Sequence, residues 1–139
     1  MASIVYNSFY NNVFTGAIDC DTDSFKIMLT TSSYTPSKSH SKRSDITNEV
    51  TGTGYTTGGN ACALTVVAVD NVNNRQEISA SVTSWTSSTI TARYGVIYKN
   101  RGGLASADEL VGCLDFTTDQ SSSGGTFAVT VSTNLRVQN

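Results

Sequence analysis

The chain has 139 residues, of which 38% are hydrophobic and 14% are charged, and its formal net charge is −2 at pH 7. This length is typical of one domain and is sufficient to bury a core without disulfide or metal cross-links. The small net charge excludes long-range attraction to nucleic acid or to an anionic membrane, and no apolar run approaches the roughly 18 residues of a membrane-spanning helix.

The rest of the composition is dominated by small polar residues. Disordered chains usually combine high charge, many prolines and few aromatics, whereas Pro36 is the only proline here and aromatic residues are spread along the chain. Thr suits exposed strand faces, and Ser, Asn and Gly suit turns. The composition therefore predicts an ordered, all-β protein.

Residues 1–16 carry aromatic side chains at irregular spacing, separated by asparagines. We expect a short strand followed by a loop or arm. The whole chain, residues 1–139, is expected to form a single β-sandwich domain in which residues 1–16 could act as an N-terminal arm.

Three acids, Asp19, Asp21 and Asp23, have the alternating spacing with which a calcium-binding loop begins. An EF-hand also needs Gly at its sixth position and Glu at its twelfth, and these positions hold Ser24 and Thr30. We therefore predict a turn in which Asp side chains accept hydrogen bonds from nearby backbone N–H groups. No metal site is expected.

Residues 24–30 alternate with a period of two, which is the signature of a strand, with Phe25, Ile27 and Leu29 on one face. The best helix candidate follows, beginning at Ser37 or Ser39 and ending near Ile46, because Ser is favoured at helix N-caps. A basic group in this segment is expected to be a solvated face and not a phosphate site: Lys38, His40, Lys42 and Arg43.

His40 is the only histidine. A Ser-His-Asp triad would have to use it, and a general base needs a fixed, partly buried ring. Because His40 lies in a polar segment, we expect it to be exposed to solvent. The adjacent carboxylates Asp108 and Glu109 would point to opposite faces of a strand, which is poor geometry for acid–base work. We predict no catalytic residue, no cofactor and no enzymatic activity.

The glycine-rich segment 51–59 lacks the Lys-Ser/Thr pair of a phosphate-binding loop and is predicted to be a crossing loop. Further strands are expected, the first of them mostly buried, at 62–70, 75–85, 88–99, 110–116 and 126–132. The third of these is the clearest, and one face of it is predicted to carry Ile90, Ala92, Tyr94, Val96 and Tyr98. About eight short strands with one short helix are typical of a β-sandwich or barrel.

Three cysteines without a C-x-x-C pair, together with the absence of a signal-peptide pattern at the start, indicate free thiols. Cys62 and Cys113 lie in apolar runs and are expected to be buried, whereas Cys20 is the one most expected to be exposed. Trp85, with Tyr94 and Tyr98, could form a platform for sugar stacking, although aromatic residues in a sandwich are more often part of the core.

Four segments, taken in order, carry a resemblance to a known family: "DSFKIMLTTSSYTPSKS", "SDITNEVTGTGYTTGG", "STITARYGVIYKN" and "LVGCLDFTTDQSSSGGTFAVTVS". Together they cover most of residues 20–131. Their S-Y-T-P, T-N-E-V-x-G-x-G-Y, T-A-R-Y and D-F-x-x-D-Q-x-S-x-G motifs resemble those of the small cementing, or capsid-decoration, proteins of tailed bacteriophages.

This resemblance implies a jelly-roll-like antiparallel sandwich that binds the outside of an icosahedral head and joins neighbouring major capsid subunits. It further implies a homodimer, made in the host cytoplasm and located on the outer surface of the virion. The alternative is a carbohydrate-binding module on the virion surface that uses Trp85 and nearby tyrosines.

Aromatic residues and arginine are over-represented at binding hot spots. The candidates for contact with the capsid or with a second copy lie in segments expected to be unpaired, and they are Tyr6, Phe9, Tyr10, Phe14, Tyr34 and Arg101.

Overall fold

The computed structural model describes residues 2–138 and is mostly β, with 45% of residues in strands and 8% in helix. The strands are β1 (Ile4–Val5), β2 (Phe25–Thr30), β3 (Asn60–Val66), β4 (Arg75–Val82), β5 (Trp85–Ser88), β6 (Thr91–Lys99), β7 (Leu110–Ser121), β8 (Gly125–Phe127) and β9 (Leu135–Gln138). The helical elements are α1 (Asn7–Phe14) and the 3-10 turn η1 (Arg43–Asp45). The predicted all-β, jelly-roll-like fold is confirmed.

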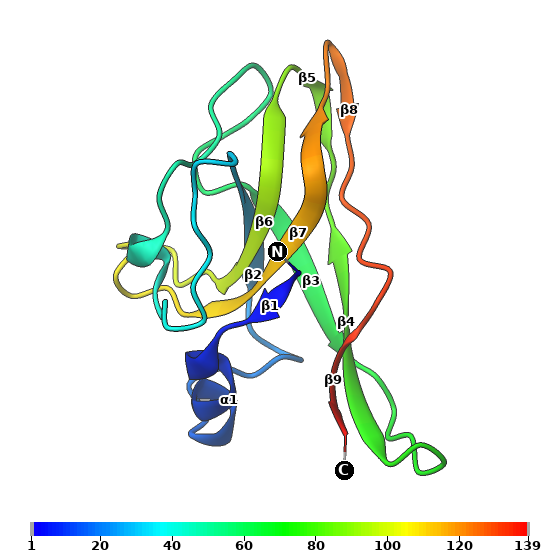
Figure 1. Ribbon diagram of the computed structural model, residues 1–139. Coiled ribbons are helices and arrows are strands. Elements are labelled where there is room, and N and C mark those ends of the chain that lie inside the picture. Colours follow the sequence, from blue (N-terminus) through cyan, green and yellow to red (C-terminus); the bar gives the residue numbers. More distant parts are fainter. Residues whose placement is uncertain (1, 139) are drawn as a thin grey trace.

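Seven strands form one curled antiparallel sheet in the order β1-β7-β6-β2-β3-β4-β9, and β5 pairs with β8 in a second, two-stranded sheet. Figure 1 shows β2, β6 and β7 on one side, with β3 crossing behind β6 and β7 towards the hairpin from which β4 starts, next to β9. The helix α1 lies at one end of the molecule, the same end at which β4 begins and β9 finishes (Figure 1).

Both faces of the central strands are buried. On β2 the odd positions Ile27 and Leu29 join a cluster inside the curl of the sheet, while Met28 points to the opposite face and joins a second cluster. The second cluster contains Tyr6, Tyr34 and other residues under the loops that follow β2. The predicted alternation of β2 is confirmed, and its polar-looking face is buried as well.

The α-helix does not lie where the sequence predicted it. The segment 37–46 forms only the short turn η1, whereas the predicted loop or arm contains α1. The reason is that segment 37–46 has too few apolar residues to bury a face. In α1, Phe9 and Val13 are four residues apart and both pack against the core, as the helical period requires.

Strand β6 differs from its predicted pattern. Ile90, just before the strand, and Ala92, near its start, belong to the cluster inside the curl, but Tyr94, Val96 and Tyr98 belong to the opposite cluster. The register between β6 and β7 shifts between Ala92 and Tyr94, where a bulge in β7 interrupts the pairing. A bulge re-aims the side chains on either side of it, so a strict period of two fails here.

Two other predicted strands also differ. The run at 62–70 was expected to be mostly buried, but β3 is largely exposed because it pairs with β2 only at Asn60 and Ala61 and then diverges. The strand predicted at 126–132 ends at Phe127, and the strand β9 was not predicted.

Candidate interaction surface

Two of the predicted contact residues are internal. Tyr6 and Tyr34 are 0% and 2% exposed, and their hydroxyl oxygens lie 3.1 Å apart in a hydrogen bond. The Tyr34 hydroxyl also lies 2.9 Å from Nδ1 of His40. His40 is therefore half-buried and held by Tyr34, which corrects the expectation of a solvent-exposed ring.

The other N-terminal aromatic residues lie on the helix α1, and the helical period of 3.6 residues sets how far each side chain is buried. Phe9 is buried and Tyr10 is half-buried against the same cluster. Phe14, in the last position of the helix, is 82% exposed. Of the six predicted contact residues, Phe14 alone presents a large apolar surface to solvent.

Arg101 is exposed, but its side chain is held in an ion pair with Glu109. Its guanidinium donates to both carboxylate oxygens of Glu109, with Nε 2.9 Å from Oε2 and the terminal nitrogen 2.9 Å from Oε1. Burial alone would raise the pKa of Glu109, but hydrogen bonds from Arg101 and Lys42 outweigh it and hold that pKa below its ordinary value.

The neighbouring carboxylate is also part of an ion network. Asp108 is fully buried, accepts a hydrogen bond of 2.7 Å from Nε of Arg43 and another of 2.8 Å from the backbone N–H of Arg101. The guanidinium of Arg43 lies over the ring of Tyr98, 5.2 Å from its centroid. Lys42 and Arg43, which were predicted to form a solvated basic face, are instead partners of these buried acids.

The acidic segment forms the predicted turn. Oδ1 of Asp19 accepts hydrogen bonds from the backbone N–H groups of Asp21, at 2.9 Å, and Thr22, at 3.3 Å. These bonds lower the pKa of Asp19, the one from Asp21 most strongly. Asp23 pairs with Lys99 at 2.7 Å. Over residues 2–138, no group of three or more His, Cys, Asp or Glu side chains could hold a metal ion.

The three thiols are buried. This confirms the prediction for Cys62 and Cys113 and corrects the one for Cys20. Burial raises the pKa of Cys20 and of Cys62 to about 11 and that of Cys113 to about 12. Cys20 is buried because it lies under the turn that begins at Asp19 and packs into the cluster inside the curl.

Trp85 is a core residue. It is 2% exposed, its ring stacks on Tyr55 at 6.0 Å between centroids, and its edge meets Phe127 at 6.1 Å. Tyr94 and Tyr98 are buried as well. These three residues offer no open ring face, so the sugar-stacking platform considered from the sequence does not form.

Large exposed apolar side chains gather instead at the end of the molecule that carries α1 and the tip of the β3–β4 hairpin. We call this set the apolar end, and it comprises Phe14, Val66, Val67, Val69, Val72 and Val137. Val69 and Val72 are 67% and 89% exposed. Figure 1 shows α1 and the hairpin tip projecting from the same end of the fold, on either side of a gap between the ribbons.

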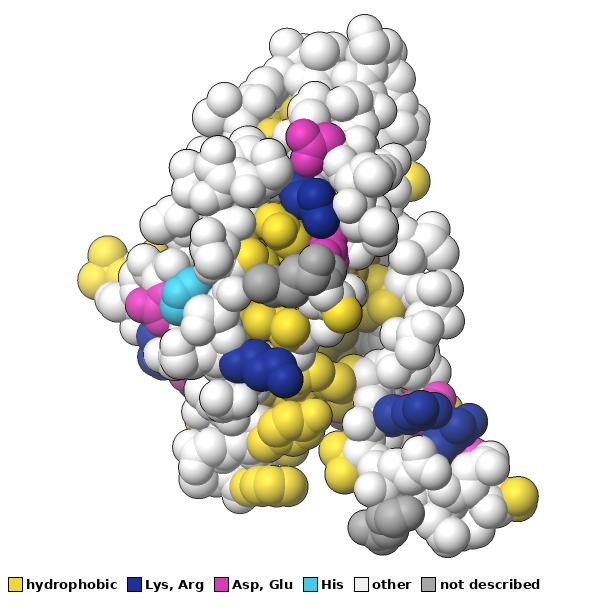
Figure 2. All heavy atoms as spheres, viewed as in Figure 1, with side chains coloured by type: hydrophobic (Ala, Val, Ile, Leu, Met, Phe, Trp, Pro, Cys, Tyr) yellow, Lys and Arg dark blue, Asp and Glu magenta, His cyan; other side chains and the backbone are white. Residues whose placement is uncertain are grey.

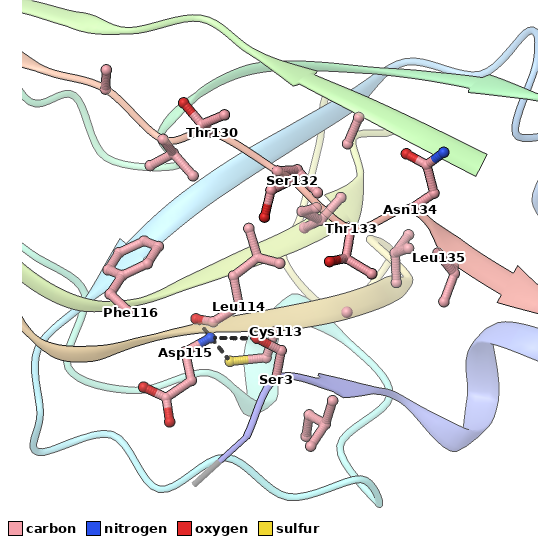
Figure 3. A pocket seen from close by; sticks show the side chains of 18 of the residues that line it. Ser3, Cys113, Leu114, Asp115, Phe116, Thr130, Ser132, Thr133, Asn134 and Leu135 are labelled. Atoms are coloured by element: carbon pink, nitrogen blue, oxygen red, sulfur yellow. Dashed lines mark hydrogen bonds between the residues drawn. The ribbon is translucent and has the colours of Figure 1, made fainter. Parts of the chain in front are cut away.

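A groove runs between β7 and the extended segment 128–133. Figure 2 shows apolar side chains in a hollow between two lobes. The groove has a volume of about 720 Å³, which lies within the usual range of binding pockets. Its floor comes from β3, β4, β6 and β7, and its walls come from β1 with β7 on one side and from residues 126–135 on the other. Figure 3 shows Thr130, Ser132 and Thr133 along one wall and Leu114 and Phe116 on the other.

The sequence reasoning missed the groove and most of the apolar end. The run "LTVVAVD" at 64–70 carries the only usable signal, because it holds five apolar residues bounded by polar ones, and this pattern predicts a mostly buried strand. Exposure of these residues depends on β3 leaving β2, which local sequence does not reveal.

Comparisons with known proteins identify no relative: no protein-family model, no curated protein and no solved structure matches this chain. A search of the helices in residues 2–138 finds none that is both long and apolar enough to cross a membrane.

Proposed function

We propose that this protein is a virion structural component that binds the outside of an icosahedral phage head and cements neighbouring major capsid subunits. The observation that carries the proposal is the apolar end, where valines and one phenylalanine stand exposed on a stiff β scaffold. Large exposed apolar side chains concentrated at one end of a domain favour a site of protein–protein contact. The resemblance to phage cementing proteins supplies the kind of partner.

The proposed mechanism is burial of surface across a joint between capsid subunits. Specific protein interfaces bury on the order of 1,600 Å² in total. Phe14 lies on one side of the apolar end and Val69 and Val72 lie on the other, so one molecule can contact two neighbouring subunits. A homodimer would add avidity, because attachment of its second copy is effectively intramolecular.

The test uses heads assembled without this protein, to which purified chain is added back. The paired substitutions Val69→Ser and Val72→Ser remove apolar surface from the exposed hairpin tip without touching the core. We expect occupancy on the heads to fall at least tenfold, and the heat resistance conferred by the wild-type chain to be lost.

The matched control is Leu104→Ser, which removes a 77% exposed apolar residue from a loop outside the apolar end. It should decorate heads as the wild type does. Truncation of residues 1–16 is a poor test because it also deletes the core residues Tyr6 and Phe9. Full decoration by the valine variant would refute the apolar end as the contact surface, and equal heat resistance of bare and decorated heads would refute the cementing function.

A further inference from the structure

We propose that the groove between β7 and residues 128–133 receives an extended, uncharged strand of a different polypeptide chain, which completes the open side of the sheet. This inference stands on the groove alone and does not depend on the proposed function. It concerns a surface distinct from the apolar end.

The first wall of the groove is a sheet edge that the chain covers only in part. β7 is twelve residues long, yet its outer edge pairs with the two-residue strand β1, at Cys113 and Gly112. Beyond β1 the edge is continued by one side chain, as Oγ of Ser3 accepts a hydrogen bond of 2.9 Å from the backbone N–H of Asp115 (Figure 3). Within residues 2–138, the stretch of β7 after Asp115 has no neighbouring strand on that side, and the backbone N–H of Thr117 there donates to Oδ1 of Asp115 at 2.8 Å.

The second wall is extended chain without a ladder. β8 ends at Phe127 and β9 begins at Leu135. Between them, residues 128–133 form no backbone–backbone hydrogen bond with any other residue in the part of the chain that the structure describes. Both walls therefore present largely solvent-exposed backbone N–H and C=O groups, which are available for pairing with an added strand.

The floor between these walls is apolar. It includes Leu64 and Ile78, which are half-buried, together with Ala80, Ile97 and Val111. An occupant must therefore place apolar side chains on the floor while it hydrogen-bonds to the walls. An extended strand does both, because alternate side chains point to one face and its backbone offers donors and acceptors along both edges. A lipid chain or another apolar small molecule would leave the wall groups unpaired.

Charge defines the occupant further. Among the described residues that line the groove, Asp115 is the only charged one, and it is neutralised by Arg93, whose Nε lies 2.9 Å from Oδ1. The exposed wall otherwise carries hydroxyl groups, including Thr130, Ser132 and Thr133. An uncharged strand that alternates β-branched apolar and hydroxyl residues matches this lining.

The experiment supplies such a strand in cis. The full chain is extended at its C-terminus by a flexible Gly/Ser linker of about 12 residues, which spans roughly 19 Å on average, and by the segment Thr-Val-Thr-Val-Thr-Val-Thr-Val. The control fusion has Pro in place of each Thr, because Pro cannot donate a backbone hydrogen bond. The readouts are amide hydrogen exchange by residue and the thermal unfolding midpoint.

We expect the Thr-Val fusion to slow exchange at least tenfold over residues 128–133 and along the outer edge of β7, and to raise the unfolding midpoint by about 5 °C. The proline control should do neither. Ala80→Glu, which puts a charge on the floor, should abolish the slowing, whereas Ala63→Glu on the exposed face of β3 should not. If Ala80→Glu fails to fold, Ala80→Gln fills the groove without a charge and should have the same effect.

Three results would overturn the proposal. One is equal exchange in the Thr-Val and proline fusions. Another is slow exchange over residues 128–133 in the unextended monomer, which would mean that the groove is already closed. The third is a dimer by light scattering in which the same residues are protected, which would make a second copy of this chain the occupant.

Discussion

Two pairs of strands differ in their surroundings, although their proportions of apolar residues are similar. The first pair is β2 and β6, and the second is β3 and β4. β2 and β6 lie in the middle of the sheet and are covered on both faces, so that Ile27 and Val96 are fully buried. β3 and β4 lie towards one edge, and every residue of β4 is at least partly exposed. The covered region supplies stability and the open region supplies surface, and the following predictions test that division.

The largest effect is expected at Gly59, in the covered region. Its φ is +76°, and an added Cβ would lie 1.8 Å from the carbonyl oxygen of Ile27. Gly59→Ala should therefore lower the free energy of unfolding by about 4 kcal/mol or more, since backbone strain and a clash with backbone act together. Gly16→Ala is the matched control, because Gly16 has a φ of +77° but no atom near the added Cβ. Gly16→Ala should lower the free energy of unfolding, measured by urea denaturation, by only about 1 kcal/mol. Equal losses in the two variants would contradict the close packing of Gly59 against β2.

A smaller contrast is expected between two isoleucines. Ile27 is 0% exposed on β2, and Ile27→Ala should cost about 3.5 kcal/mol, by loss of burial and creation of a cavity. Ile78 lies half-buried on β4 at the floor of the groove, and Ile78→Ala should cost about 1 kcal/mol. Chemical denaturation of both variants measures the difference. A cost at Ile78 as large as that at Ile27 would mean that the groove is not open in solution.

A pH effect smaller than either core substitution is expected at Asp115. The hydrogen bond from Arg93 holds the pKa of Asp115 below its ordinary value, despite partial burial. A carboxylate with a lowered folded-state pKa stabilises the fold at neutral pH, and this contribution is lost as pH falls from about 5 through the folded-state pKa. Arg93→Met should therefore make the acid-induced loss of stability shallower. The stability of both proteins between pH 6 and 3 checks this, and parallel curves would show that the pair does not contribute.

The smallest effect on stability is expected at the hairpin tip. Val72 is 89% exposed, so Val72→Ser should change the free energy of unfolding by less than about 0.5 kcal/mol. A change above about 1 kcal/mol would instead show that Val72 is covered in the isolated protein.

Secondary structure was predicted best from the sequence where the local residue pattern matches the burial of the segment in the fold. β2 was predicted from its period of two and the start of β7 from its apolar run, and both segments are buried in the fold. The helix α1 was missed because its eight residues are few and Asn-rich, so that its apolar stripe consists only of Phe9, Tyr10 and Val13. β9 was missed because its four residues, although they alternate between apolar and polar, form too short a run to indicate a strand.

The candidate surface was predicted only in part. Phe14 was named from the sequence, but Tyr6 and Tyr34 were named with it and prove to be core residues joined by a hydrogen bond. Of the exposed valines, Val66, Val67 and Val69 lie in the run that predicts a mostly buried strand. In each case the residue type was informative, but whether the side chain faced solvent depended on contacts with segments far away in the chain.

Local sequence alone was enough to predict the all-β class, the acidic turn before β2 and the burial of two cysteines. These features follow from the intrinsic preferences of Thr, Val, Asp and Gly over a few neighbouring residues. Three features could be seen only in the folded chain: β3 diverges from β2, residues 128–133 have no backbone hydrogen-bond partner within residues 2–138, and an apolar groove and an apolar end result. Those features depend on which strands meet, and strand pairing is set by the sum of many long-range contacts that no local pattern contains.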